Sequence, residues 1–503
     1  MASKKLGILF LVSVILAFLA GYYISVVIPS TPDESSNDTF DQITTSFKNF
    51  YYYDIDDVEV EAAFIASMKG IVESYAQANN DPYTRLVANP LSVAPSGDET
   101  FIGIGIVFVM EDLNLRISFV YVGSAAENLL FPNDLIIGIM VDGQPLYFDT
   151  LNSEEEVLSY LSGSLDDTKT LIVVDPDQNE YQVTVTYIEI PTPTAYTVDL
   201  GEDDIVYIKI THFSGYIQDV TPGTAKVFSD LLNELEASNL DINSASKTLI
   251  LDLRDNPGGS LSALHNNDNS AMIPGITQQL LTNNVEKPLF QMIPRSGEVS
   301  SFYGNLTSLK PYDIAVLVNG RSASASEVLA AALSINGGYQ LYGYPTYGKG
   351  VYQNTLNLYE ISNIRYSLVY TEGQWTYDDG KNVHEDPLDV NIIEQDGIRA
   401  LEMPLYGGEV GFNEVSYELG NYQAFLNYFF EFSGVNELRT DGYFDLATQN
   451  AIEDFQLDQN LTVTGNLDRE TAIKIHQIYM TDIQDLTKDV QLQTLIDLIN
   501  FAS

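Results

Sequence analysis

The spacing of apolar positions changes several times along the chain, and each change marks an element or a boundary. An uncharged, strongly apolar run covers residues 6–28, directly after Lys4 and Lys5. At about 1.5 Å per helical residue the run spans roughly 35 Å, enough to cross a bilayer. It predicts an N-terminal transmembrane helix, and the preceding lysines place the rest of the chain outside the cytoplasm. A cleaved signal peptide is the alternative, although the apolar run continues past Ala20 and Gly21.

Between this anchor and residue 190 the apolar spacing changes from helical to strand-like. A polar linker over residues 29–40 precedes residues 41–94, where apolar side chains three and four positions apart predict two or three helices. From residue 95 the period becomes two, which predicts strands. The predicted strands cover residues 101–109, 115–122, 135–140 and 183–190, and a short helix is predicted at 123–129.

Strands and helices alternate between residues 191 and 405, after a boundary marked by Pro191 and Pro193. This order is typical of an α/β layer structure with at least some parallel strands. The predicted strands cover 205–210, 248–252, 314–318 and 339–343, and the predicted helices cover 223–236 and 327–335.

An internal repeat lies within residues 415–485. Gly442 is followed three residues later by Asp445, which can cap a helix, and the same spacing recurs at 465–468. The repeat predicts a small all-α domain, and a tail helix is predicted at 486–503. The predicted fold class is multidomain, with α/β and α+β parts: an N-terminal transmembrane helix, a β-sandwich-like domain, an α/β core and a small all-α C-terminal domain.

Composition narrows the classes of function that the chain can have. It holds 23 basic and 70 acidic residues, which gives a formal net charge of −47. Such a surface repels phosphate groups, which excludes a nucleic-acid partner and argues against binding to anionic lipid. The absence of cysteine excludes thiol nucleophiles, thiolate zinc sites and disulfides. No cofactor or metal site is indicated, and few histidines are present for a histidine-based triad: His212, His265, His384 and His476.

Two segments join a strand to a turn of small residues. The first ends in the turn 256–259, whose paired glycines let backbone amides approach a ligand. The second passes through residues 322–326 into a helix, where free N–H groups stabilise developing negative charge. Serine is also a common helix cap, so this segment alone is equally typical of a structural turn.

A third segment places a lysine in an apolar, aromatic setting. Lys349 lies between Gly348 and Gly350, and burial there would lower its pKa until the amine can act as a base. Residues four apart on a strand share a face, so Gln353 can hydrogen-bond that amine. An ordinary lysine in a turn is the alternative.

Together with residues 81–84, these segments resemble the carboxyl-terminal processing peptidases, serine proteases that use a Ser/Lys dyad. Their order and spacing match over most of residues 40–400. The resemblance implies that Ser324 is the nucleophile, Lys349 the general base and Gln353 the residue that orients it.

The resemblance also implies an oxyanion hole. The amides of Ala325 and of Gly258 or Gly259 would form it, and such a donor contributes roughly 3 kcal/mol in other proteases. A histidine-dependent variant of the mechanism, through His212 or His265, is the alternative.

The residues that flank Ser324 are not assigned to catalysis. Ser322 and Ser326 are interpreted as structural, and Glu327 as a first-turn carboxylate favoured by the helix dipole. The polar stretch 260–268 and Arg321 depart from the family pattern, and both bear on the shape of the substrate pocket.

Residues 95–190 resemble a PDZ domain, which binds a peptide as an added strand and holds its terminal carboxylate on backbone amides. The segments 123–127, 131–136 and 141–143 also carry this resemblance. It implies a reader of substrate C-termini that gates the protease; a structural sandwich without peptide binding is the alternative. The implied carboxylate loop consists of Phe101, Ile102, Gly103, Ile104 and Gly105.

Residues 415–480 resemble the peptidoglycan-binding helical module through Asp441, Gly442, Thr448 and the segment 451–456. The whole chain is therefore predicted to be a single-pass bacterial membrane protein with an extracytoplasmic serine endopeptidase on the cell-wall side. Its predicted partners are protein or peptide substrates with free C-termini, peptidoglycan and the membrane; its N-terminal helices also allow a homodimer. A non-catalytic scaffold and a signalling protease dedicated to one partner are the alternatives.

Overall fold

The computed structural model describes residues 45, 57–90, 100–217, 221–238, 247–266, 273–361 and 364–502. The predicted transmembrane helix at 6–28, the linker at 29–40 and, apart from Thr45, the predicted helical region before residue 57 lie outside this part of the chain. Within it, no helix combines the length and apolar character needed to cross a bilayer. The chain divides into two compact units, Met1–Asn89 with Asn354–Thr371 and Pro90–Gln353 with Glu372–Ser503.

The smaller unit contains one described helix and a turn rich in hydrogen bonds. Phe64 of the helix contacts Tyr359, with ring centroids 5.3 Å apart. After the helix, the carboxylate of Asp81 accepts hydrogen bonds from the hydroxyls of Thr84 (2.6 Å) and Thr371 (3.1 Å). These bonds fix the turn between helix and strand. The elements are α3 (Asp57–Ala78), β1 (Arg85–Pro90) and parts of β17 (Val351–Ile361) and β18 (Ile364–Thr376), with β1 and β17 both paired to β18.

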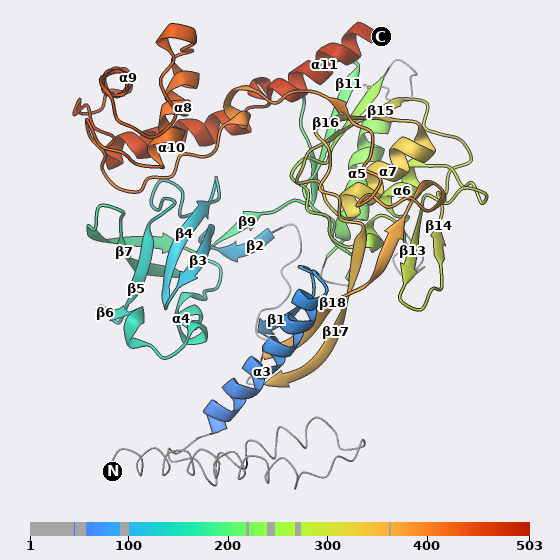
Figure 1. The fold of residues 1–503 in the computed structure, drawn as a ribbon, viewed down its shortest axis with the longest axis horizontal. Coiled ribbons are helices and arrows are strands. Elements are labelled where there is room, and N and C mark those ends of the chain that lie inside the picture. The colour runs from blue at the N-terminus through green and yellow to red at the C-terminus, as the bar shows by residue number, and fades with distance from the viewer. Residues whose placement is uncertain are drawn as a thin grey trace, which may run out of the picture. The chain divides into compact units, whose positions relative to one another are not determined.

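Residues 100–191 form the strand-rich region of the larger unit. Five strands pair antiparallel in the order β3-β4-β5-β7-β8, β6 pairs with β5, and β2 and β9 form a separate ribbon. Leu115, Ile117 and Phe148 are completely buried in the core. The elements are β2 (Thr100–Gly103), β3 (Ile106–Glu111), β4 (Asn114–Val120), β5 (Leu135–Val141), β6 (Gln144–Tyr147), α4 (Glu154–Leu161), β7 (Thr168–Val174), β8 (Glu180–Thr186) and β9 (Ile188–Pro191) (Figure 1).

Two sequence predictions in this region are wrong in detail. The predicted strand at 101–109 is divided into β2 and β3, because Gly105 adopts a left-handed backbone conformation with φ +84°. The predicted helix at 123–129 is a run of turns, because Gly123 and Asn128 are also left-handed, with φ 77° and 62°. A right-handed helix cannot continue through either residue.

A six-stranded sheet forms the centre of residues 195–392. Its order is β10-β11-β12-β15-β16-β19, and all neighbours are parallel except β10 and β11. The predicted alternation of strands and helices is therefore confirmed here, as is the parallel pairing. The elements are β10 (Ala195–Thr197), β11 (Ile205–Ile210), α5 (Gly223–Ala237), β12 (Thr248–Asp252), α6 (Ile276–Leu280), β13 (Phe290–Pro294), β14 (Ser300–Phe302), β15 (Asp313–Val318), α7 (Ala325–Gly337), β16 (Gln340–Gly343) and β19 (Asn391–Ile392).

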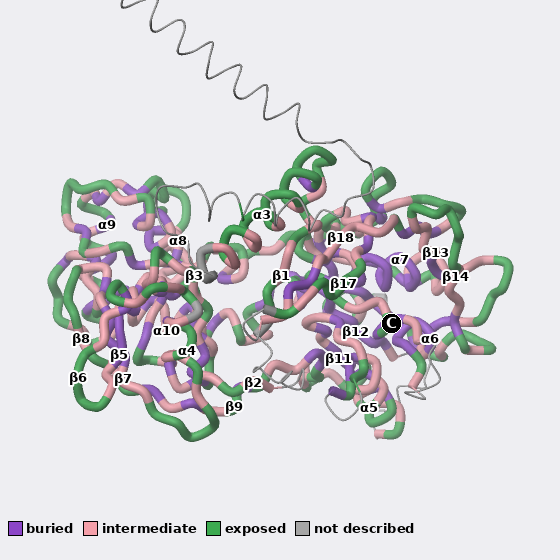
Figure 2. Tube along the Cα trace, turned by 90° about the horizontal axis from the view of Figure 1, so that it is seen from below, coloured by how far each residue is buried: buried purple, intermediate pink, exposed green. Residues whose placement is uncertain are grey.

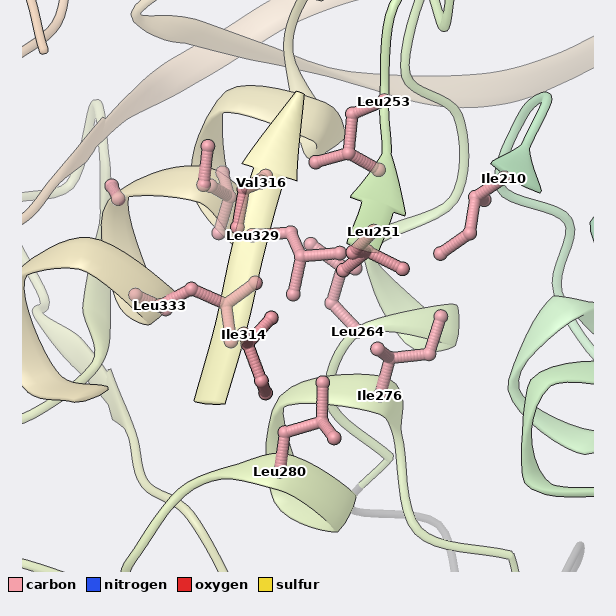
Figure 3. Packing of buried hydrophobic residues seen from close by; sticks show 14 of the residues in the cluster. Ile210, Leu251, Leu253, Leu264, Ile276, Leu280, Ile314, Val316, Leu329 and Leu333 are labelled. Carbon is pink, nitrogen blue, oxygen red and sulfur yellow. The ribbon is translucent and has the colours of Figure 1, made fainter. Parts of the chain in front are cut away.

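The first face of this sheet packs against helices α5, α6 and α7. Side chains alternate between the two faces of a strand, and Leu251 and Val316 point to the same cluster as Leu329 and Leu333 of α7 (Figure 3). Figure 2 shows many buried residues around α7, whose positions 325–333 are all buried. The start of α7 is therefore held rigidly at the carboxyl end of β15.

The second face of the sheet packs against the C-terminal helix α11 (Val490–Ala502). Leu492 and Leu495 are completely buried in a cluster with Ile250 of β12 and Leu317 of β15. The sequence predicts a helix here, but as a tail. In the structure this helix packs on the sheet and supplies the second apolar layer that strands buried on both faces require.

Three helices between β19 and α11 contain the internal repeat. The carboxylates of Asp445 and Asp468 each accept a hydrogen bond from the amide three residues on, so both predicted helix caps are confirmed. Two buried amides, Gln423 and Gln456, accept from the glycine turns of the two halves, at 3.0 Å each. The helices are α8 (Leu419–Phe429), α9 (Leu446–Asp458) and α10 (Arg469–Gln484).

The strand-rich region and the helical module contact each other through a buried cation. Arg469, the first residue of α10, lies 2.8 Å from Asp134 and 3.5 Å from Asp175. Both carboxylates are almost completely buried, and Tyr181 also donates to Asp134 at 2.8 Å. A cavity of about 330 Å³ adjoins this contact, and its lining includes Phe131, His476 and Met480.

Candidate active site

Ser324 lies in a strained turn between β15 and α7. Its φ of 57° and ψ of −117° are unusual for a residue with a side chain, and such strain is typical of functional turns. Ser324 is partly exposed, whereas Ser322 and Ser326 are completely buried. The Ser322 hydroxyl donates to the Leu253 carbonyl (2.8 Å) and the Ser326 hydroxyl to the Asn256 carbonyl (2.9 Å), which confirms their structural interpretation.

The glycine turn after β12 lies directly against the Ser324 turn. A Cβ added at Gly258 would lie 2.8 Å from the Ser324 Cβ and 3.0 Å from the Ala325 nitrogen, so only glycine permits this approach. The amide of Gly258 donates to the side chain of Asn256 (2.9 Å). Among the described residues, no hydrogen-bond acceptor is found for the amides of Gly259 or Ala325, and the latter begins a helix. These two amides are therefore available to an oxyanion.

Lys349 and Gln353 lie together, as the strand spacing predicts. The Lys349 amine donates to Oε1 of Gln353 at 2.7 Å. The glycine after the lysine is required, because a Cβ at Gly350 would lie 1.8 Å from the side chain of Asn382. The Lys349 carbonyl accepts from the indole of Trp375 (2.8 Å), which fixes the backbone before β17.

Glu327 connects the serine and lysine segments. Its completely buried carboxylate accepts the amide of Ser324 (2.8 Å) and the amide of Lys349 (2.9 Å) on the same oxygen. The other oxygen accepts the amide of Gly348 (2.6 Å). The sequence suggested only a first-turn carboxylate, because a Glu three residues after a cap is common in helices of every function. Its role in joining two distant segments requires the tertiary structure.

Two further residues that stand out in the sequence, His265 and Arg321, have contacts of their own. His265 contacts the backbone of Tyr303 (3.0 Å) and the edge of Phe302, and burial lowers its pKa. Arg321 lies at the surface and pairs with Asp255 of the glycine turn at 2.6 Å. The departure at Arg321 thus supports the outer side of that turn.

The five residues predicted to hold a carboxylate are divided between a strand and a turn. Phe101, Ile102 and Gly103 belong to β2 and pair with β9. Ile104 and Gly105 form the turn before β3, and their carbonyls accept the amides of residues 126 and 121, respectively. The short turn therefore lies at the beginning of β3, which is an edge strand of its sheet.

No group of three or more metal-ligating side chains is found among the residues that the structure describes. The arrangement offers a hydroxyl at a helix start, an amine held by an amide, and two backbone N–H groups, of Ala325 and Gly259, for which no acceptor is found among the described residues. This is the chemistry of acyl transfer by a serine hydrolase.

Comparison with known proteins identifies the class. The model described as "Peptidase family S41" matches residues 204–393, and the model described as "Putative peptidoglycan binding domain" matches residues 417–475. The fold and site define a serine peptidase. The chain carries an S41 serine peptidase of the C-terminal processing type over residues 204–393 and a peptidoglycan-binding domain over residues 417–475.

Relatives match along most of the chain. The carboxy-terminal processing protease CtpB of Bacillus subtilis (strain 168) is 27% identical over 436 residues, 85% of this chain and 83% of that protein. A probable CtpA-like serine protease of Staphylococcus aureus (strain bovine RF122 / ET3-1) is 25% identical over 419 residues, 82% of this chain and 76% of its own. The solved photosystem II D1 C-terminal processing protease is 19% identical with a TM-score of 0.38, covering 70% of this chain and 87% of that one.

Proposed function

We propose that this peptidase cleaves exported proteins near their C-termini, outside the cytoplasm, through an acyl-enzyme on Ser324. The observation that carries the proposal is the carboxylate of Glu327, which joins the Ser324 and Lys349 segments while Gln353 holds the lysine amine at 2.7 Å. A nucleophile, a base and a group that orients the base are thus supplied by adjacent backbone segments.

The proposed reaction begins when the neutral amine of Lys349 accepts the proton of the Ser324 hydroxyl. The serine oxygen then bonds to the carbonyl carbon of the substrate, and the carbonyl oxygen becomes an oxyanion. The amides of Ala325 and Gly259 would hold that oxyanion, since the Gly258 amide is already bonded to Asn256. The C–N bond breaks as the protonated lysine gives its proton to the leaving amine, and water then hydrolyses the ester.

Recognition of a substrate C-terminus is proposed for strand β3. Among the described residues β3 pairs only with β4, so its other edge can accept a peptide as an added strand. Val107 and Val109 project from β3 and are 41% and 59% exposed. The turn at Ile104 and Gly105 would receive the carboxylate at the end of this strand.

Location is proposed from the sequence and from the C-terminal domain. The apolar run at 6–28 would anchor the chain, and the repeat at 417–475 would bind peptidoglycan. Because the chain has a net charge of −47, the part outside this anchor is not expected to bind to an anionic lipid surface. Binding of the full-length protein to purified cell wall, compared with a variant lacking residues 417–475, tests the second point.

The central test is cleavage of an unstructured protein such as casein by the full-length chain. Ser324→Ala and Lys349→Ala are expected to abolish cleavage, and Lys349→Arg as well, because a guanidinium stays protonated and cannot act as the base. Activity of Ser324→Ala equal to wild type would refute the nucleophile. Activity in Lys349→Arg would refute the amine base.

The second test compares one peptide substrate with a free and with an amidated C-terminus. The free acid is expected to be cleaved faster, because only it offers a carboxylate to backbone amides. Equal rates would contradict recognition of the C-terminus and leave the dyad untouched.

A further inference from the structure

A buried ion pair connects the C-terminal segment to Arg254, which lies between the end of β12 and the glycine turn. The guanidinium of Arg254 donates to both oxygens of Asp489, at 2.7 and 3.0 Å, and to the side chain of Gln491 at 3.1 Å. Asp489 is completely buried, and Arg254 is 4% exposed. A bidentate pair shielded from water fixes the direction of the guanidinium closely.

Asp489 is itself held in place by α11. Its carboxylate accepts the amide of Leu492 at 3.1 Å, so it caps the helix that it precedes. Leu492 and Leu495 are completely buried against the central sheet, and the side chain of Gln491 donates to the carbonyl of Ile393 at 2.7 Å. The position of this carboxylate is therefore determined by the packing of the whole helix.

The negative charge of Asp489 balances positive charge in its buried surroundings. Arg254 also bonds to Asp252 at 2.6 Å, and Lys209 bonds to the same carboxylate at 3.1 Å. Asp252 is completely buried. Without Asp489, Arg254 and Lys209 would share one carboxylate in a site with little access to water, and Arg399, which lies 3.4 Å from Asp489, would lose this ion pair; both effects are unfavourable.

Arg254 is followed at once by the turn that carries the proposed oxyanion donor. Asp255 has a left-handed φ of 61°, and the side chain of Asn256 donates to the carbonyl of Ile210 while accepting the amide of Gly258. Arg254 lies directly before Asp255, so a displaced guanidinium would shift the start of this turn and, through Asn256, the backbone that places Gly259.

We propose that Asp489 is a positioning residue for the peptidase reaction: through Arg254 it fixes the turn 255–259 and so the oxyanion-binding amide of Gly259. The inference rests on the proposed function of that turn. It also assigns residues 486–502 to the peptidase itself. The matched peptidase segment ends at residue 393 and the matched wall-binding segment at 475, so this part of the chain lies beyond both.

The test compares Asp489→Asn with Asp497→Asn in the full-length protein. Asp497 is an exposed residue of the same helix, so the control loses the same charge without touching Arg254. Asp489→Asn is expected to lower kcat by about tenfold to a hundredfold with KM within about twofold, as for other misplacements of reacting groups. Asp497→Asn is expected to match wild type in both.

A second readout separates positioning from a structural role. A peptide aldehyde forms a hemiacetal with the serine and needs the oxyanion donors, whereas the product peptide does not. Asp489→Asn is expected to weaken aldehyde binding by about tenfold and leave product binding unchanged. Equal loss of both, or no loss of either at an unchanged Tm, would overturn the inference.

If Asp489→Asn fails to fold, Asp489→Glu tests the positioning role in its place. It keeps the charge and shifts the guanidinium, so kcat is expected between the values of wild type and Arg254→Lys. A folded Asp489→Glu with wild-type kcat and aldehyde affinity would refute the positioning role. Failure of the proposed function is distinguishable, because wild type would then be inactive or Ser324→Ala active.

Discussion

Glu327 connects the two segments that hold the proposed nucleophile and base. Its side chain accepts three backbone amides, from Ser324, Gly348 and Lys349, with no exposure to solvent. A carboxylate is suited to this place because both of its oxygens are acceptors, and neither carries a hydrogen that would face an amide. Ser324 and Lys349, the proposed nucleophile and base, thus share one support.

Glu327→Gln is expected to lower kcat at least about tenfold and to lower the Tm. The glutamine amide would place an N–H group against one of the three donors, which leaves a buried donor unpaired at a cost of about 1–3 kcal/mol. Steady-state kinetics and thermal unfolding measure both effects. Glu298→Gln, at an exposed position, is the matched control, and equal behaviour of the two variants would contradict the role assigned to Glu327.

The elements of the central sheet could be predicted because their signals are local. The run at 248–252 has three apolar residues at its centre and becomes a strand buried on both faces, as this composition indicates. The contact between Lys349 and Gln353 was predicted from strand spacing, although Lys349 itself lies two residues before β17 begins. The turns at 123–129 were not predicted, since Asn128 adopts a left-handed conformation that its sequence neighbours do not reveal.

The place of α11 could not be predicted for a different reason. Its apolar positions indicate a helix, but nothing local states that it packs on Ile205 and Ile250, which lie more than two hundred residues earlier. The proposed oxyanion donor could not be predicted from local sequence either. Sequence left Gly258 and Gly259 open, and only the bond from Gly258 to Asn256 separates them.

Leu492→Ala is expected to destabilise the peptidase by about 2–5 kcal/mol, the usual range for a buried leucine. Leu492 is completely buried, whereas Leu498 on the same helix is 48% exposed. Leu498→Ala should therefore change the free energy of unfolding by no more than about 0.5 kcal/mol. Urea unfolding of both variants measures the difference, and equal values would show that α11 is not part of the core.

At the scale of the molecule, Arg469 joins the strand-rich region of residues 100–191 to the helical module that contains α8, α9 and α10. Arg469→Ala would leave Asp134 and Asp175 buried without their cation, and we expect the contact to weaken by about 3 kcal/mol. Hydrogen exchange in β5 and β7 should then rise. Arg439→Ala, which removes an exposed pair with Asp441, should leave exchange unchanged. Equal exchange in both variants would contradict a specific contact.

The same contact is expected to respond to pH through His476. Burial lowers the pKa of His476 to about 4 from its ordinary 6.5, and its ring lies 6.3 Å from that of Phe131. The unfolded chain therefore binds the proton more readily. The stabilisation is complete above pH 6.5 and is lost as the pH falls toward 4. The Tm of wild type relative to His476→Gln should decline between pH 7 and pH 5; a constant difference would contradict this.

Because α11 follows the helical module in the chain, it is synthesised after all the other elements of the peptidase. During synthesis, residues 490–502 appear after every strand of the sheet that they cover. Until then, Ile250 and Leu317 have no apolar layer over them and Arg254 lacks the carboxylate of Asp489. The core of the peptidase is therefore complete only when the residues of α11 have been synthesised.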